Sequence, residues 1–464
     1  MKDRKNIGIL SSREALRFVR ISKSNESENT VTLILTLLIL CIVYMIRHMN
    51  DTTKIQLEEF YGVTKEDVAW SNTICTVVNL LWPLIAGILV DMMGAKMEIF
   101  ACTVITFSAQ FLITFSSIPL FNQNPNYALF LLGRFLVGIG QGGLNAGFLT
   151  ILSKIFAKNN LATAIGFYLF VDVIARFLPL FLMPVILQNG KNYAPFIGSN
   201  VVGLVICAIA ILISIILLLR NDSSQTSQYG ADRIQTAYYT EWSFLLEWRF
   251  YIFVGLNCFF FAGQVATAGL LTPYFIEVYS MTVASAGMVI PITLGSAAIL
   301  SPFMGILVDN VKQNAFFILI GCISLCISLL LFAFTANMVF AIIGLVLFAI
   351  SAGTYYSAWV ASCPSFIQSP ELGRANGVFK TIENWVIMLV VFSTSQIKNN
   401  ATQNSFLIIF LFMGILAFLC VILGIVNLAA WGDNKKKMSI PMSVPNSENI
   451  RLFGYFSKDK NNLY

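Results

Sequence analysis

The sequence predicts an all-α membrane protein with twelve transmembrane helices in two pseudo-symmetric six-helix bundles. Its 464 residues are 57% hydrophobic and only 11% charged, whereas about a quarter of the residues in a soluble protein are charged. Long apolar stretches recur along the chain on both sides of a polar central segment. The two halves also share a pattern of residues, which predicts that one bundle repeats the other.

Each bundle is expected to contain six apolar spans, because about twenty apolar residues cross the hydrocarbon core of a bilayer as a helix. The first six stretches cover residues 31–49, 70–91, 98–118, 127–151, 162–186 and 195–219. The second six cover residues 250–272, 284–308, 315–335, 338–361, 373–395 and 405–429. The predicted organisation is a tail (1–30), a first bundle (31–219), a linker (220–249), a second bundle (250–430) and a second tail (431–464).

The distribution of Lys and Arg orients these spans, because basic residues concentrate on the cytoplasmic side of a membrane. If both termini and the linker are cytoplasmic, 22 basic residues fall in the tails, the inner loops and their edges, Lys380 among them. Only Lys54, Lys65, Lys191 and Lys398 then fall outside. We therefore expect cytoplasmic termini, while the plasma membrane and a lysosome-like compartment both remain open as the host membrane.

An internal repeat relates the two halves. At an offset of 211 positions the matching pairs are Asn126 and Asn337, Gly133 and Gly344, Leu161 and Leu372, Ala164 and Ala375, Gly166 and Gly377, and the two acids Asp172 and Glu383. The pentapeptide GILVD also occurs at both 87–91 and 305–309. Six helices repeated in parallel are typical of transporters whose binding site lies between the halves.

Two motifs carry a family resemblance. "GILVDMMGAK" at 87–96 resembles the loop signature of the major facilitator superfamily, and "GRFLVGIGQG" at 133–142 resembles its fourth-helix signature. The loop signature departs from the family pattern at Met92, and its second copy departs at Lys312. The resemblance covers residues 31–430 and implies the major facilitator fold and transport by alternating access.

Within the superfamily, two segments look most like the lysosomal dipeptide transporter and its relatives. They are "ELGRANGVFKTIEN" at 371–384 and "SPFMGILVD" at 301–309. This closer resemblance implies an amino-acid-like or dipeptide-like zwitterion as the solute.

Four charged residues lie within the predicted spans. At 1.5 Å per residue, Asp172 and Glu383 are each about 15 Å deep in their helices, and Arg176 and Arg134 lie at a similar height. Intramembrane charges usually face a protein interior or a water-filled cavity and have a function there. The sequence therefore predicts that all four residues line one central solute-binding layer.

These charges can be assigned in more than one way. Arg176 suits a carboxylate or another anionic group, because its planar fork makes bidentate contacts. Asp172 or Glu383 would meet an ammonium group or carry a coupling proton. In the alternative, Asp172 only neutralises Arg176 or Arg134 so that both can be buried. Arg134 also matches the arginine of the fourth-helix signature, which the resemblance associates with structure or proton movement.

Weaker binding candidates are aromatic and amide side chains at a plausible depth. "TYYSAW" at 354–359 places two tyrosines and a tryptophan close together, and an asparagine follows Glu383. The candidates are Tyr355, Tyr356, Trp359 and Asn384. Most buried aromatic residues serve packing, which is the alternative for each of them.

Glycine and aspartate residues at the inner ends of two spans are gating candidates. Gly87 and Gly305 allow a neighbouring helix to approach closely. Asp91 and Asp309 can accept hydrogen bonds from the free N–H groups at the start of an adjacent helix and so hold one face closed. The loop signature adds Gly94 to this set. Helix capping without any gating role is the alternative.

We therefore expect a secondary transporter of a small hydrophilic organic solute, with a zwitterion favoured and a proton-coupled anionic metabolite second. A transport-inactive scaffold or receptor with the same fold is the alternative of another class. No G-x-x-x-x-G-K-[ST] motif is present, which argues against ATP as the direct energy source. The single histidine, His48, argues against a histidine-rich metal site. The expected partners are the solute, coupled protons and lipid, with no enzyme activity, cofactor, metal or nucleic acid; no accessory subunit is indicated.

Overall fold

The computed structural model describes residues 12–118, 125–156, 160–188, 194–220, 242–335, 337–400 and 404–438. Most of the predicted linker and of the C-terminal tail lies outside these ranges. Within the predicted N-terminal tail, residues from Ser12 onward belong to the first helix.

The described chain is helical throughout, as predicted. The helices before the linker are α1 (Ser12–Thr52), α2 (Lys54–Tyr61), α3 (Lys65–Val77), α4 (Trp82–Met93), α5 (Ala95–Ser116), α6 (Tyr127–Phe156), α7 (Leu161–Gln188) and α8 (Ala194–Leu219). The helices after it are α10 (Trp248–Tyr279), α11 (Val283–Val311), α12 (Asn314–Phe334), α13 (Met338–Ser362), α14 (Leu372–Asn400) and α15 (Ser405–Met438). Short 3₁₀ turns lie at Val78–Leu80, Ser243–Leu246, Cys363–Ser365 and Ser369–Glu371.

Eleven described helices are long and apolar enough to span a bilayer, and a bent pair brings the total to twelve. The bent pair contains the predicted span at 70–91. Lys65–Leu80 and Trp82–Met93 meet at an angle of 49°. Pro83 at the start of α4 explains the break, because proline has no N–H to continue a helical ladder. The chain is a multi-pass membrane protein.

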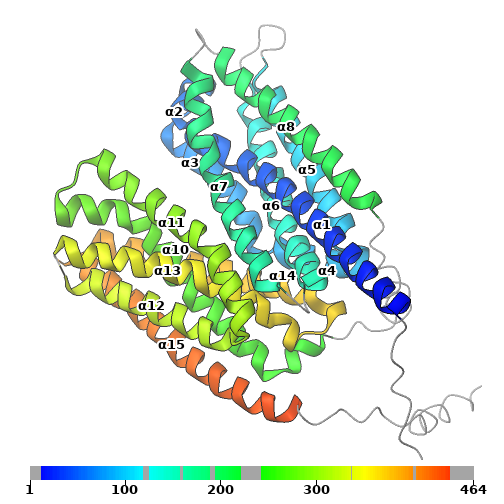
Figure 1. Ribbon diagram of the computed structural model, residues 1–464. Coiled ribbons are helices and arrows are strands. Elements are labelled where there is room, and N and C mark those ends of the chain that lie inside the picture. The colour runs from blue at the N-terminus through cyan, green and yellow to red at the C-terminus, as the bar shows by residue number, and fades with distance from the viewer. Residues whose placement is uncertain are drawn as a thin grey trace, which may run out of the picture.

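The helices form two groups that meet at one end and diverge toward the other (Figure 1). Helices α1–α8 form the first group and α10–α15 the second. The groups touch where α4 packs against α14 and where α7 packs against α11. These two contacts are equivalent under the internal repeat, since each pairs a helix that ends in GILVD with a helix of the opposite half. We call this the closed end.

Glycines allow the backbones to approach at the closed end. A Cβ on Gly87 would overlap the carbonyl oxygen of Gly373, and a Cβ on Gly305 would overlap the carbonyl oxygen of Ala162. In both places a helix backbone lies against a helix of the other group. Side chains larger than hydrogen would therefore separate the two halves.

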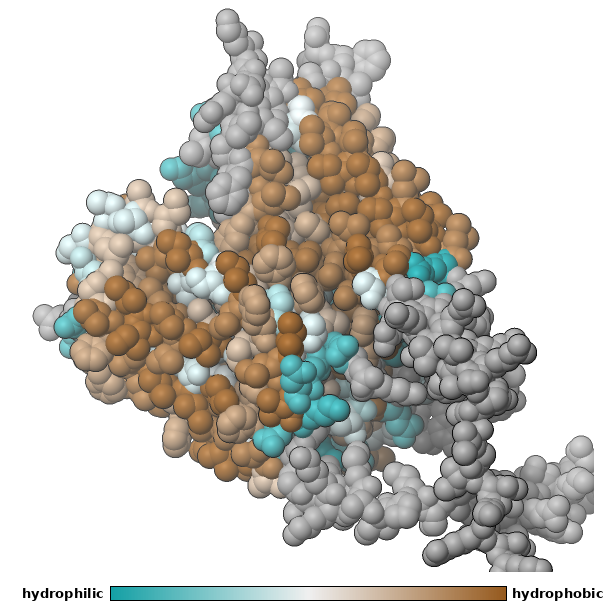
Figure 2. Space-filling view, in the orientation of Figure 1, coloured by the Kyte–Doolittle hydropathy of each residue, from teal (hydrophilic) through white to brown (hydrophobic). Residues whose placement is uncertain are grey.

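The outer faces of both groups are apolar. Large hydrophobic side chains such as Leu212, Ile216, Ile299 and Phe303 are exposed. Figure 2 shows apolar side chains spread over both groups, with hydrophilic ones gathered mainly toward the ends. A continuous apolar surface of this kind is what a lipid environment stabilises.

A test of the packing is the close contact between α3 and α6. A Cβ on Gly138 would overlap the backbone oxygen of Cys75, which no side-chain rotation can relieve. We expect Gly138→Val to destabilise the protein by at least about 1–3 kcal/mol and to lower the midpoint of thermal unfolding in detergent. Gly287→Val is the matched control, because nothing lies within 4 Å of a Cβ at that position. Equal midpoints for the two variants would contradict this packing.

Candidate solute-binding site

A cavity of about 1000 Å³ lies between the two groups of helices. Helices α1, α3, α6 and α7 line it from the first group, and α10, α11, α13 and α14 line it from the second. Its charged lining residues are Arg47, Asp172, Arg176, Lys380 and Glu383. Polar neutral residues add to the lining, with Gln141 and Asn145 on α6 as the central pair.

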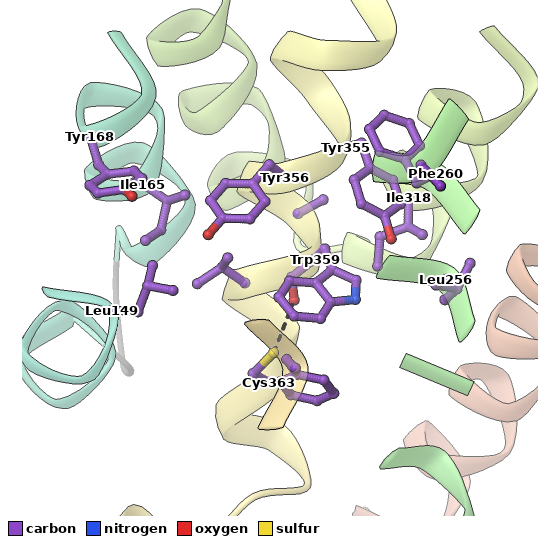
Figure 3. Close-up of a cluster of buried hydrophobic side chains, with 14 of the residues drawn as sticks. Leu149, Ile165, Tyr168, Leu256, Phe260, Ile318, Tyr355, Tyr356, Trp359 and Cys363 are labelled. Atoms are coloured by element: carbon purple, nitrogen blue, oxygen red, sulfur yellow. Dashed lines mark hydrogen bonds between the residues drawn. The ribbon is translucent and has the colours of Figure 1, made fainter. Parts of the chain in front are cut away.

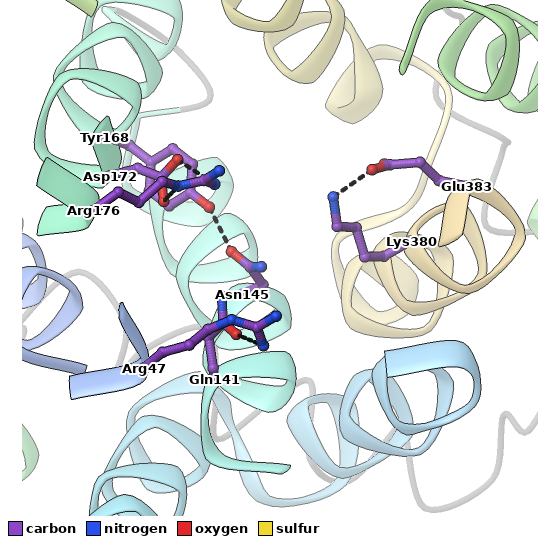
Figure 4. Close-up of polar contacts among 8 residues, drawn as sticks. All are labelled: Arg47, Gln141, Asn145, Tyr168, Asp172, Arg176, Lys380 and Glu383. Carbon is purple, nitrogen blue, oxygen red and sulfur yellow. Dashed lines mark hydrogen bonds and ion pairs between the residues drawn. The ribbon is translucent and has the colours of Figure 1, made fainter. Parts of the chain in front are cut away.

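Asp172 and Arg176 form a bidentate ion pair on α7. Arg176 Nη2 lies 2.7 Å from Asp172 Oδ2, and Nε lies 3.3 Å from Oδ1 (Figure 4). The spacing of four residues places both on one helix face, as predicted. The Arg176 side chain is 48% exposed, whereas Asp172 is buried. The aspartate therefore orients a guanidinium that remains accessible from the cavity.

Glu383 on α14 faces the cavity from the opposite half and is paired with Lys380 (Figure 4). Its second carboxylate oxygen accepts a hydrogen bond of 2.8 Å from Asn257 Nδ2 on α10. Lys380 thus corrects the sequence analysis, which counted it as a basic residue at the edge of an inner loop. Its position one helical turn before Glu383 places both side chains on the same face of α14.

Arg47 on α1 is a cavity residue that the sequence analysis missed. Its Nη1 contacts Gln141 Oε1 and lies 3.4 Å from Cys75 Sγ, and Nη2 lies 3.3 Å from Thr76 Oγ1. No carboxylate within the described ranges pairs with it. The available signal was the one that identified Asp172, namely a charge inside an apolar stretch, but Arg47 lies near the end of its span.

The prediction that Arg134 on α6 belongs to a four-residue layer lining the cavity is wrong. Arg134 is 1% exposed and is not among the residues that line the cavity. Nη1 donates to the carbonyl oxygen of Arg47 at 2.9 Å, and Nη2 donates to Asn72 Oδ1. Depth along the helix placed Arg134 near Arg176, but α1 and α3 cover this part of α6 and enclose the guanidinium.

The aromatic candidates divide between cavity and core (Figure 3). Tyr356 lines the cavity. Tyr355 is 0% exposed and stacks on Phe260 with ring centroids 3.7 Å apart, so it is a core residue. Trp359 is also buried, and its Nε1 donates to the carbonyl oxygen of Phe253. The prediction that Tyr355 and Trp359 line the site is wrong: Tyr355, one position before Tyr356, points to another face of α13, and Trp359, one turn after Tyr356, is covered by Phe253.

Asn384 lines the cavity next to Glu383. Its Nδ2 donates to the carbonyl oxygen of Asn79 at 2.7 Å, which connects α14 to the bend between α3 and α4. On the opposite wall, the hydroxyl of Tyr168 donates to Asn145 Oδ1 (Figure 4). These neutral groups supply donors and acceptors for an uncharged polar part of a solute.

At the closed end, each aspartate of the repeat caps a helix of the opposite half. Asp91 accepts from the N–H groups of Gly373 and Arg374 at 2.9 Å each, and from Arg374 Nε at 3.0 Å. Asp309 accepts from Ala162 N at 3.1 Å and from Thr163 N at 2.7 Å, and it also accepts from the Thr163 hydroxyl. These are the contacts that the sequence predicted for Asp91 and Asp309, and a gating role for them stays a prediction.

Gly94 follows α4 with φ +91° and ψ 149°. Residues other than glycine rarely adopt this conformation. It allows the chain to reverse between α4 and α5 directly after Asp91.

Within the described ranges, no three His, Cys, Asp or Glu side chains gather in a group that could hold a metal ion.

The contact of Asp309 with α7 gives a direct test of the closed end. Asp309→Ala leaves two backbone N–H groups without their acceptor, and hydrogen bonds to charged groups contribute about 1.5–3 kcal/mol each. We expect the population open at this end to rise at least about tenfold. Pulsed EPR between spin labels at Met92 and Leu246, both exposed, measures the distance across this end.

The control for this test is Asp67→Ala, which removes a partly exposed aspartate that caps α3 away from the closed end. We expect its distance distribution to match that of the unmodified protein. An unchanged distribution in Asp309→Ala would show that this contact does not hold the end closed.

Comparison with known proteins gives a family and several similar folds. The sequence profile described as Major Facilitator Superfamily matches residues 36–391. None of the curated proteins matches the chain. A crystal structure of a double Trp mutant of XylE superposes with a TM-score of 0.69 at 12% identity, covering 86% of this chain and 95% of that one.

Two further structures have the same fold. The human organic anion transporter MFSD10 gives a TM-score of 0.64 at 14% identity, over 85% of this chain and 99% of that one. The E. coli fucose:proton symporter FucP gives 0.59 at 17% identity, over 84% and 99%. At such low identity, these likenesses concern the fold alone.

Proposed function

We propose that this chain, which belongs to the major facilitator superfamily and is a secondary transporter, transports a small hydrophilic organic solute that carries a carboxylate group. Arg47 is the residue proposed to bind that carboxylate. The observation that carries the proposal is the balance of charge in the cavity.

Three cations and two carboxylates line the cavity. Asp172 is paired with Arg176, and Glu383 is paired with Lys380. Arg47 is held only by neutral groups among the described residues, so one positive charge has no counter-ion there. Such a charge at the wall of a cavity attracts an anionic group, and the planar guanidinium suits bidentate contact with a carboxylate.

Between the two solute classes expected from the sequence, the excess positive charge favours an organic anion. This preference reverses the one expected from the sequence, which favoured the zwitterion. The order changes because the sequence analysis placed Lys380 outside the cavity and did not include Arg47. The proposed pose places the carboxylate against Arg47 between the two ion pairs, which lie on facing walls (Figure 4). Polar groups of the solute would meet Gln141, Asn145 and Asn384.

A zwitterion is the second candidate. Two carboxylates line the same cavity, so an ammonium group could approach Asp172 or Glu383 while the carboxylate meets Arg47. The resemblance of segments 371–384 and 301–309 to the lysosomal dipeptide transporter supports this candidate. An ammonium would have to compete with Arg176 or Lys380, which is the physical argument for placing it second.

Alternating access follows from the closed end. We propose that the bundles 31–219 and 250–430 rock about the cavity, with the Asp91 and Asp309 contacts breaking when the closed end opens. Both termini are proposed to be cytoplasmic, because the count of basic residues favours that side. The closed end would then face the cytoplasm and the diverging end the opposite side.

The role of Arg47 is tested by uptake into proteoliposomes of labelled succinate, dialanine and xylose, which represent an anion, a zwitterion and a neutral solute. We expect succinate to be taken up best. Arg47→Gln should weaken its binding by at least about 2 kcal/mol, roughly thirtyfold in Kd. Arg47→Lys should be intermediate, because it keeps the charge and loses the fork.

Lys398→Gln is the matched control, since it removes a cation that is paired with Glu277 outside the cavity. Preferred uptake of dialanine would instead support the zwitterion. Uptake that Arg47→Gln leaves unchanged would overturn the assigned role. A transport-inactive scaffold with this fold predicts no uptake of any solute.

A further inference from the structure

The carboxyl group of Glu98 is a buried acid that the solute-binding site does not use. Glu98 lies in the first turn of α5 and is 2% exposed. Its Oε1 accepts a hydrogen bond of 2.9 Å from Cys102 Sγ, and its Oε2 has no partner among the described residues. No ion pair of the described chain includes it.

Two glycines of α6 provide the space for this carboxyl group. A Cβ on Gly143 would lie 2.8 Å from Glu98 Oε1, and a Cβ on Gly147 would overlap Oε2. Helix α6 therefore lies directly on the acid. Its packing excludes solvent from the group while offering no side chain to neutralise it.

Within the part of the chain that the structure describes, the neighbouring helices supply no counter-ion to Glu98. Helices α1, α4, α6 and α8 pack against α5. Among the described side chains at the closed end, these helices carry the charged residues Glu28, Asp91 and Lys154, Arg220 follows α8 directly, and α5 itself adds Lys96. Asp91 is bonded to α14, and Lys96 donates to the carbonyl oxygen of Arg220 at 2.9 Å. Among the described side chains, only the thiol of Cys102 hydrogen-bonds to Glu98.

This environment distinguishes Glu98 from the two acids of the cavity. Asp172 and Glu383 are each paired with a cation that compensates the charge of the carboxylate. An ionised carboxylate buried without a cation is very costly, and such a group takes up a proton instead. In this conformation, therefore, Glu98 is the carboxyl group best placed to hold a proton.

Two further polar atoms lie against the same stretch of α6 as Glu98, near Gly142 and Gly143, and one of them belongs to a residue of the cavity wall. Asn79 lines the cavity, and its Oδ1 is buried without a partner in the described part of the chain. Trp82 Nε1 is also buried without a partner among the described residues, and it lies 3.1 Å from the position of a Cβ on Gly143. On the other side, Glu98 is four residues beyond Gly94, or about 6 Å along the helix from the closed end.

We propose that Glu98 is a proton-binding site of the transport cycle, placed behind the cavity wall and loaded with a proton while the α4–α14 end is closed. When that end opens, water reaches the first turn of α5 and solvates the carboxylate. The O–H bond of the carboxyl group then breaks, and the proton passes to water. In the return step, a proton from the cavity side reaches the carboxylate and neutralises it. This role rests on the proposed transport cycle, whereas proton binding itself does not.

Infrared difference spectroscopy of the purified protein during a pH titration tests proton binding without any solute. A protonated carboxyl group has a C=O stretch distinct from that of a carboxylate. We expect Glu98→Gln to remove one such band and to lower by one the number of protons that the protein releases on a jump to high pH. Glu277→Gln is the matched control, because Glu277 is exposed and paired with Lys398.

The link to the opening of the closed end is tested with the double variant Asp91→Asn, Asp309→Asn. We expect the band assigned to Glu98 to lose intensity at a pH where the unmodified protein retains it. An unchanged band in Glu98→Gln would overturn the assignment. An unchanged band in the double variant would overturn the release step. If Glu98→Gln does not fold, Glu98→Asp replaces it, and a shift of that band supports the assignment while an unshifted band overturns it.

These outcomes are independent of solute uptake. The presence or absence of the Glu98 band can be measured even if the protein transports none of the tested solutes. Conversely, normal succinate uptake does not depend on the assignment of the proton to this residue. Failure of the proton site and failure of the proposed function can therefore be told apart.

Discussion

The structure depends on a reciprocal contact in which one carboxylate from each half caps a helix of the other half. Asp91 binds the first N–H groups of α14, and Asp309 binds those of α7. Free N–H groups and the positive end of a helix make each site favourable for an anion. Because both contacts lie at one end, the halves are held there and diverge elsewhere, which leaves the cavity between them.

Inside that cavity, electrostatic balance separates two kinds of charged group. The Asp172–Arg176 and Lys380–Glu383 pairs are internally compensated, so they orient side chains without adding net charge. Arg47 has only neutral partners among the described residues, and the charge it adds is the basis for the proposed anionic solute. Glu98, behind the wall, has no cation among the described residues and is proposed to hold a proton instead. Solute selection and proton binding are thus assigned to different residues in the same half.

The sequence predicted the features that depend on short-range geometry. The spacing of four residues places Asp172 beside Arg176, and the repeated GILVD segment places two aspartates at equivalent helix ends. The features that it missed depend on how helices pack. Arg134 has the expected depth but is enclosed by α1 and α3, and Tyr355 faces Phe260 in the core. The spacing of Lys380 and Glu383 is also local, but that this pair faces the cavity and not a loop edge depends on how α14 packs.

The most direct test of the central claim is a structure of the protein determined with a bound carboxylate solute, either succinate or dialanine, whichever the transporter takes up. The account predicts that the solute carboxylate lies within hydrogen-bonding distance of the Arg47 guanidinium, between the two ion pairs. A solute bound with its carboxylate on Arg176 or Lys380 alone, or outside the cavity, would contradict it.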